Sequence, residues 1–213
     1  MGVRIGREMA GVEGRRRVVI ERVTPEVDGG RYPIKRTIGE DVVVEADVFA
    51  DGHDCLGVAL LSRRDGDLEW YETPMTFLTN DRWQASFQAA ELGRYVYTVT
   101  GWVDHFETWR QGFMKKVDAG QAAPVEILQG ARLIDAASQR APGAEGQSLK
   151  EWADRLKSSD ESERRRIEQV LDQNLAVVMA KYPDRRFATR YERELGVVVD
   201  REKARFSAWY EMF

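Results

Sequence analysis

The sequence predicts an α+β protein in which an immunoglobulin-like antiparallel β-sandwich is interrupted by an inserted helical bundle of about four helices. Three observations predict this fold. Short strand-like segments separated by turn residues fill roughly the first half of the chain, and helical periodicity follows them. β-Branched residues return near the end, where two strands alone are too few to bury a face. We therefore expect the last strands to rejoin the first sheet, with the helices looped out between them.

The same pattern divides the chain into three parts. Residues 1–17 are rich in Gly and Arg and are expected to form a flexible N-terminal arm. Residues 18–103 together with 185–213 are expected to form one discontinuous β-sandwich, and residues 104–184 are expected to form the inserted helical bundle. No helical segment alternates with the early strands, so a doubly wound parallel sheet is not expected.

The early strands are predicted from alternating or β-branched runs that end at turn residues. Gly marks several of these ends, because it adopts a positive φ without steric cost. A turn at residues 64–67 is expected to join two of the strands into a hairpin. The expected strands are residues 18–23, 41–50, 56–63, 68–73, 74–78, 82–88 and 94–103.

The segment 93–113 changes from strand to helix. Its first half alternates, so Tyr97 and Val99 are expected to lie on one face of a strand. From Asp104 onward the apolar residues recur at helical spacing, and Asp104 with Glu107 matches a capping box. This stretch is therefore first of all a junction between a strand and a helix.

Three more helices are expected after this junction. Residues 124–138 begin with a Pro, which the first turn of a helix tolerates. Ser148 and Ser158 are each followed by Glu three residues later, so each is expected to cap a further helix. The second of these is expected to be the longest, at roughly 160–181, and Pro183 stops it.

Strand character returns at residues 195–200, which form a β-branched run. Apolar residues then alternate with polar ones from Ala204 to Tyr210, which predicts a second closing strand. The chain ends in the apolar stretch AWYEMF, and we expect the natural polypeptide to continue beyond it.

Composition and charge exclude several classes of protein. The formal net charge is -4 with both signs interspersed, which argues against a dedicated nucleic-acid binder. No run approaches the ~20 apolar residues of a membrane span, and no signal-peptide run is expected at the start. Cys55 is the only cysteine, so no internal disulfide is expected. Together these features predict a cytoplasmic protein that binds neither nucleic acid nor membrane.

The sequence shows no catalytic or metal-binding motif. The two histidines, His53 and His105, lack a second His or Cys at zinc-ligand spacing, and no phosphate loop or nucleophile elbow is present. Asp104, His105 and Glu107 would carry the chemistry of a free-standing enzyme, although Asp104 has a capping role available. We predict no catalytic residue, no metal and no cofactor for this chain.

Aromatic residues suggest an alternative role in carbohydrate binding. Trp and Tyr rings stack on flat apolar surfaces such as sugar faces, although a buried core would also account for them. Adjacent Trp70 and Tyr71 should point to opposite faces, so one of them is expected to be exposed or buried under the helical insertion. Trp70 and Trp102 are the predicted carbohydrate-binding residues. Val177 and Met179 widen the apolar surface of the longest helix, which fits either core packing or a subunit contact.

Several segments, in order, resemble the maltosyltransferases of glycoside hydrolase family 13 that use α-maltose 1-phosphate. They are VTPEVDGGRYPIKRTIGEDVVVEADVFADGHD, NDRWQASF, GRYVYTVTGWVDHFETWRQGF, AGQ at 119–121 and the closing RFSAWYEMF. The resemblance covers nearly the whole chain, from about Arg17 onward. It implies a β-sandwich interrupted by a helical bundle, both preceding a (β/α)8 catalytic barrel.

The resemblance also implies a function. The family transfers maltosyl units from α-maltose 1-phosphate to the non-reducing end of α-1,4-glucans, using an aspartate nucleophile and a glutamate acid/base on the barrel. No residue of this chain receives those roles. We therefore expect an N-terminal accessory region, inactive alone, that forms a homodimer through the β-sandwich and the helical insertion. A glucan-binding module using exposed aromatics is the alternative.

Overall fold

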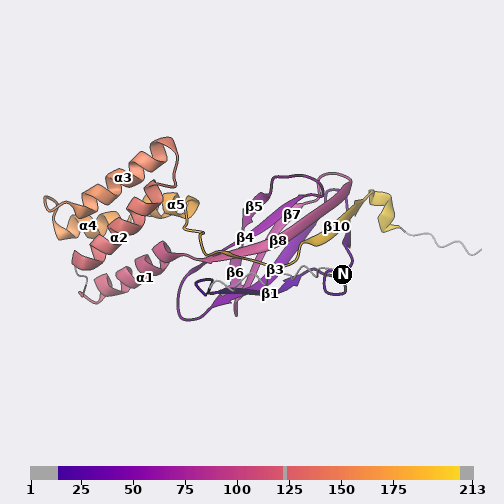
Figure 1. The fold of residues 1–213 in the computed structure, drawn as a ribbon, viewed down its shortest axis with the longest axis horizontal. Helices are drawn as coiled ribbons and strands as arrows, with labels where there is room; N and C mark the ends of the chain where they lie inside the picture. The colour runs from indigo at the N-terminus through magenta and orange to yellow at the C-terminus, as the bar shows by residue number, and fades with distance from the viewer. Residues whose placement is uncertain (1–13, 122–123, 207–213) are drawn as a thin grey trace, which may run out of the picture.

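The computed structural model describes residues 14–121 and 124–206, and it is an α+β structure with two sheets and five α-helices in these ranges. The molecule is elongated, with the helices gathered at one end and the strands at the other (Figure 1). Most of the expected flexible arm and the end of the second closing strand lie outside the described residues. Residues 202–205 form a short 3-10 helix, so the strand predicted to begin at Ala204 is wrong there.

The first sheet has four strands, and all of its neighbours are antiparallel. Its central strands carry the alternation seen in the sequence, with Val42, Val44 and Ala46 buried on one face. The strand order is β1 (Val18–Thr24), β3 (Asp41–Ala50), β7 (Arg82–Gln88) and β6 (Thr76–Thr79).

The second sheet contains the strand that returns after the helices. β10 pairs antiparallel with β8, where Leu195 lies opposite Tyr97, and parallel with β2, where Val197 lies opposite Ile34. The parallel pair departs from the predicted all-antiparallel arrangement. The order is β2 (Ile34–Thr37), β10 (Leu195–Asp200), β8 (Gly93–Val103), β4 (Leu56–Arg64) and β5 (Tyr71–Pro74), and β9 (Thr189–Arg190) pairs with the end of β8.

The two sheets share one apolar core. Tyr97 is fully buried in it, and its hydroxyl donates a hydrogen bond to the Pro25 carbonyl. Burial raises the pKa of Tyr97, so the hydroxyl keeps its proton. The core includes Val18, Ile20, Val42, Val44, Val48, Val58, Leu60, Val99, Leu195, Val197 and Val199.

The helices pack around a second, separate apolar core. It includes Phe106, Trp109, Phe113, Ile127, Ala131, Ile134, Leu149, Leu156, Val170, Leu175 and Met179. The helices are α1 (His105–Asp118), α2 (Pro124–Ser138), α3 (Gly143–Lys157), α4 (Glu163–Leu171) and α5 (Gln173–Lys181). The predicted helix at 160–181 is therefore two helices. Asp172 separates them, because its carboxylate accepts a hydrogen bond from the Asn174 N–H at 2.8 Å and caps α5.

Two of the predicted helix caps are wrong. Ser148 lies inside α3, which begins five residues earlier and buries Leu149 and Leu156. Ser158 ends α3, and Ser162 caps α4 instead, accepting a hydrogen bond from the Arg165 N–H. A Ser-x-x-Glu spacing fits the interior of a helix as well as its start, so the pattern alone did not locate these ends.

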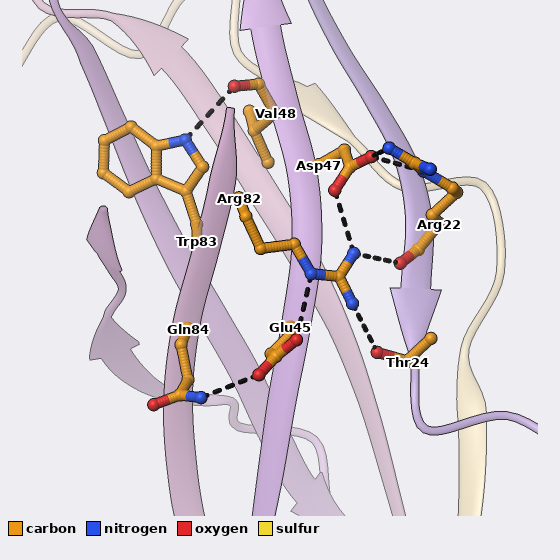
Figure 2. A network of polar contacts seen from close by, with 8 residues as sticks. All are labelled: Arg22, Thr24, Glu45, Asp47, Val48, Arg82, Trp83 and Gln84. Atoms are coloured by element: carbon orange, nitrogen blue, oxygen red, sulfur yellow. Dashed lines mark hydrogen bonds and ion pairs between the residues drawn. The ribbon is translucent and has the colours of Figure 1, made fainter. Parts of the chain in front are cut away.

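A polar network covers the face of the four-stranded sheet that is turned away from the core (Figure 2). Arg82 donates to Glu45 at 3.0 Å, to Asp47 at 2.9 Å and to the Thr24 hydroxyl at 2.8 Å. Arg22 also binds Asp47, which is buried. Burial alone raises the pKa of Asp47, but hydrogen bonds from Arg82 and Arg22 outweigh it, so the pKa lies below its ordinary value.

The contact between Gly130 and the Trp109 ring gives a test of the helical core. A Cβ at Gly130 would lie 2.1 Å from that ring, so Gly130→Ala is expected to destabilise the protein by about 1–3 kcal/mol. Gly112→Ala is the matched control. Apart from its chain neighbours and the backbone of its own helix, no described atom would lie within 4 Å of a Cβ added there, so this substitution is expected to stabilise α1 by about 0.5–1 kcal/mol. Urea unfolding followed by far-UV circular dichroism measures both, and the reverse ranking would contradict the packing.

The polar network predicts a pH-dependent contribution from Asp47. Asp47→Asn is expected to lower the free energy of unfolding by about 1–3 kcal/mol at neutral pH, because two arginines lose a buried anion. The pKa of Asp47 is depressed in the folded state. The extra free energy of unfolding of the wild type is therefore fully present above the ordinary aspartate pKa of about 3.9, and it is lost as the pH falls through the pKa of the folded state. Asp41→Asn, on the exposed end of the same strand, is the control. A difference between wild type and Asp47→Asn that is unchanged at pH 3 would refute this origin.

Candidate functional site

The two predicted carbohydrate-binding residues lie over the outer face of the six-stranded sheet, in an arginine–tryptophan cluster. We define this cluster as Arg63, Trp70, Glu72, Trp102, Arg185, Arg190 and Glu194. β8 turns Tyr97 and Val99 toward the core, so alternate residues such as Trp102 face outward. The arginines at 185 and 190 come from the segment that returns from α5 to the sheet.

Trp102 is covered. Only 7% of the residue is exposed, and the Arg185 guanidinium carbon lies 3.9 Å from the ring centroid. A Cβ at Gly57, which pairs with Trp102, would lie 2.3 Å from the ring, so the ring lies directly against that glycine. Arg185 is in turn held by Glu72 through two hydrogen bonds of 2.6 Å, which lower the pKa of Glu72.

Two other arginines of the cluster lie over Trp70, which is partly buried. The guanidinium carbons of Arg63 and Arg190 each lie 4.5 Å from its ring centroid. Glu194 pairs with both, at 3.2 Å from Arg63 and 3.0 Å from Arg190. The same carboxylate therefore organises both cations over one ring.

Tyr71 has the opposite environment. It is 73% exposed, which confirms that one ring of the adjacent pair is free. The sequence singled out this pair, but Arg190, one of the two arginines over Trp70, comes from a distant segment and carried no local signal. Tyr71 pairs with Ser62 in the hairpin between β4 and β5, which was predicted correctly.

Asp104, His105 and Glu107 serve the start of α1. The Asp104 carboxylate accepts the Glu107 N–H at 2.9 Å, which confirms half of the predicted capping box. The Asp104 N–H donates to the Cys55 carbonyl at 2.8 Å rather than to Glu107. His105 is exposed. The Asp104 carboxylate is thus engaged by backbone and the Glu107 carboxylate by the Gln111 amide, rather than by the imidazole.

The cavity near this junction is small, and the titratable groups beside it are not poised for catalysis. A cavity of about 50 Å³ lined by Arg140, Tyr182 and Asp184 is large enough for water but too small for a sugar. Hydrogen bonds from Arg186 lower the pKa of Asp184 to about 2. Burial raises the pKa of the Cys55 thiol, which disfavours the reactive thiolate.

Within the described ranges, no three side chains of His, Cys, Asp or Glu are grouped so that they could hold a metal ion. The described helices are also too short or too polar to cross a membrane. The arrangement as a whole offers ring stacking and paired hydrogen-bonding groups rather than a nucleophile with its base.

Known proteins resemble this chain over most of its length. Residues 16–201 match a family model described as alpha-1,4-glucan:maltose-1-phosphate maltosyltransferase, domain N/S. The relative of that name from Chlorobaculum tepidum is 44% identical over 203 residues, covering 94% of this chain and 30% of the relative. The relative from Myxococcus xanthus is 44% identical over 204 residues, covering 92% of this chain and 30% of the relative. The relative from Methylacidiphilum infernorum is 38% identical over 212 residues, covering 100% of this chain and 31% of the relative.

The chain thus spans about 30% of the length of these curated relatives. The family match includes both sheets, all five helices and every member of the arginine–tryptophan cluster. This chain belongs to the domain N/S family of the α-1,4-glucan:maltose-1-phosphate maltosyltransferases.

Proposed function

We propose that this chain is the N-terminal accessory and dimerisation region of a maltosyltransferase. The whole enzyme would transfer maltosyl units from α-maltose 1-phosphate to the non-reducing end of α-1,4-glucans. The match of residues 16–201 to domain N/S carries this proposal. The name of the relatives identifies the donor and the polymer. We assign the catalytic groups to the larger part of those relatives that this chain does not match.

The proposal includes a division of the chain. Residues 18–103 and 185–213 would form an immunoglobulin-like β-sandwich, residues 104–184 an inserted helical bundle, and residues 1–17 an N-terminal arm. Two separate apolar cores, one shared by the sheets and one within the helices, support this division. A single, half-buried Cys55 fits a reducing compartment, and we propose the cytoplasm.

Apolar side chains on the helices support the homodimer. Val125 is 74% exposed and Val177 is 55% exposed, and neither belongs to the helical core. Met114 on α1 and Leu128 on α2 are further exposed apolar side chains of the helices. Contact with a second copy would remove such side chains from water, which is the main driving force of association.

Glucan binding is the second candidate function. Trp70 and Trp102 are its predicted residues, and each ring would have to exchange an arginine contact for a sugar. The observation that favours this function is the exposed ring of Tyr71, which has no such competitor among the described residues.

Catalysis is expected to require sequence outside this chain. Incubated with maltose 1-phosphate and glycogen, the 213-residue chain should release no phosphate, whereas the full-length Chlorobaculum tepidum relative should release it. A chimera in which this chain replaces the matched region of that relative should regain transfer activity. Phosphate release by the chain alone, or a folded chimera without activity, would refute the proposal.

Self-association is expected to depend on the exposed helical valines. Val125→Glu and Val177→Glu should each weaken the dimer about tenfold or more, because an unpaired carboxylate would be buried. Leu68→Glu is the matched control, since Leu68 is 93% exposed in the turn between β4 and β5. Sedimentation across concentration measures the effect. A wild-type chain that stays monomeric, or an equal effect of Leu68→Glu, would count against this interface.

A further inference from the structure

A groove lies between the two sheets, beside the hairpin of β4 and β5. It has a volume of about 570 Å³, within the range of ligand sites in proteins. Both sheets line it, with Tyr71 and Thr73 from β5, Phe87 from β7 and Tyr95 from β8. The groove is therefore built from strands whose register is set by the shared core.

Strand alternation directs Tyr71 into this groove. Thr73 pairs with Leu60, a core residue, so Tyr71, two residues earlier, faces the same side. Trp70 and Glu72 face the other side, where arginines hold them. Tyr71 consequently keeps an open ring on a strand at the edge of its sheet.

The charged side chains around the groove carry a small negative excess. Arg64 supplies one positive charge, and Asp67 and Glu91 supply two negative ones. The Arg63 guanidinium lies on the other side of its strand, over Trp70 and beside Glu194. Arg64 pairs with Glu91 at 2.6 Å. A lining without an excess of positive charge gives no attraction for a phosphate or an acidic peptide. A neutral molecule with many hydroxyls can accept from the guanidinium and donate to the carboxylates.

Aromatic and polar groups lie close together at the inner wall. The Tyr95 hydroxyl accepts a hydrogen bond from the Glu91 N–H at 3.1 Å and can still donate one. Phe87 lies 6.3 Å from the Tyr95 ring, which makes one side of the wall apolar. A pyranose presents this same combination of an apolar face and a polar rim.

We propose that this groove binds a neutral oligosaccharide, with Tyr71 stacked on a pyranose ring and Arg64 and Glu91 hydrogen-bonded to its hydroxyls. The identification of that sugar as an α-1,4-glucan rests on the proposed function. Tyr71 acts as the platform, and the backbone contacts of Arg64 and Tyr95 keep the polar groups in place.

Native electrophoresis of the 213-residue chain in gels containing glycogen tests the groove, with calorimetric titration of maltoheptaose to give affinities. Wild type should be retarded. Tyr71→Ala should bind about tenfold more weakly, a change of about 1.4 kcal/mol, because both the stacking contact and the area that the ring buries are lost. Tyr71→Phe keeps the ring and should bind like wild type. Cellohexaose, with a different linkage, should bind more weakly than maltoheptaose.

Tyr32→Ala is the matched control, because Tyr32 is 51% exposed and does not line the groove. Circular dichroism confirms that each variant is folded. Three outcomes would each refute binding in this groove. They are wild-type affinity in Tyr71→Ala, no retardation of the wild type, and a loss of affinity confined to Trp70→Ala or Trp102→Ala. These binding assays contain no maltose 1-phosphate, so an absence of glycogen binding would not change the result expected for the chimera. An inactive chimera, in turn, would not change the retardation by glycogen.

Discussion

The antiparallel pairing of β10 with β8 is the contact on which the remaining architecture depends. It adds β10, which follows the five α-helices in the chain, to a sheet whose other long strands precede those helices. The entropy of closing a connection grows slowly with its length, so the intervening helices oppose this pairing only weakly. β10 also contributes Leu195, Val197 and Val199 to the shared core, and it is the only neighbour of β2 among the described strands. Removing β10 would therefore expose one edge of β8 and would also separate β2 from the sheet.

The return of the chain to β8 also explains why neighbouring aromatic residues differ so much. Arg185, Arg190 and Glu194 arrive with the returning segment and occupy the outer face of the six-stranded sheet. Cation–π contacts and paired carboxylates hold the tryptophans there. The inner side of β5 lies beyond the reach of that segment, which leaves the Tyr71 ring exposed. Adjacent residues at the start of β5 therefore differ, with the Trp70 ring packed and the Tyr71 ring exposed.

Regular segments could be predicted from the sequence, and irregular ones could not. The strands at 41–50 and 82–88 and the helix at 124–138 have the predicted limits, because their periodicity is strong. β2 and β9 were missed, since four and two residues are too short to show alternation and both depend on distant partners. The break at Asp172 was missed because one carboxylate caps a helix within an otherwise continuous helical pattern. At the candidate site the aromatic residues were identified, but Arg185, Arg190 and Glu194 are brought to them only by tertiary structure.

The position of the helices in the chain has a consequence for how such a protein can change over generations. The polypeptide leaves the sheet after Val103 and rejoins it at Thr189, which pairs with Gly101. Departure and return therefore lie side by side on one strand. Lengthening, trimming or exchanging the helices leaves the hydrogen-bond register of the strands as it was. Descendants of a common ancestor can accordingly diversify one half of the molecule while inheriting the other half intact.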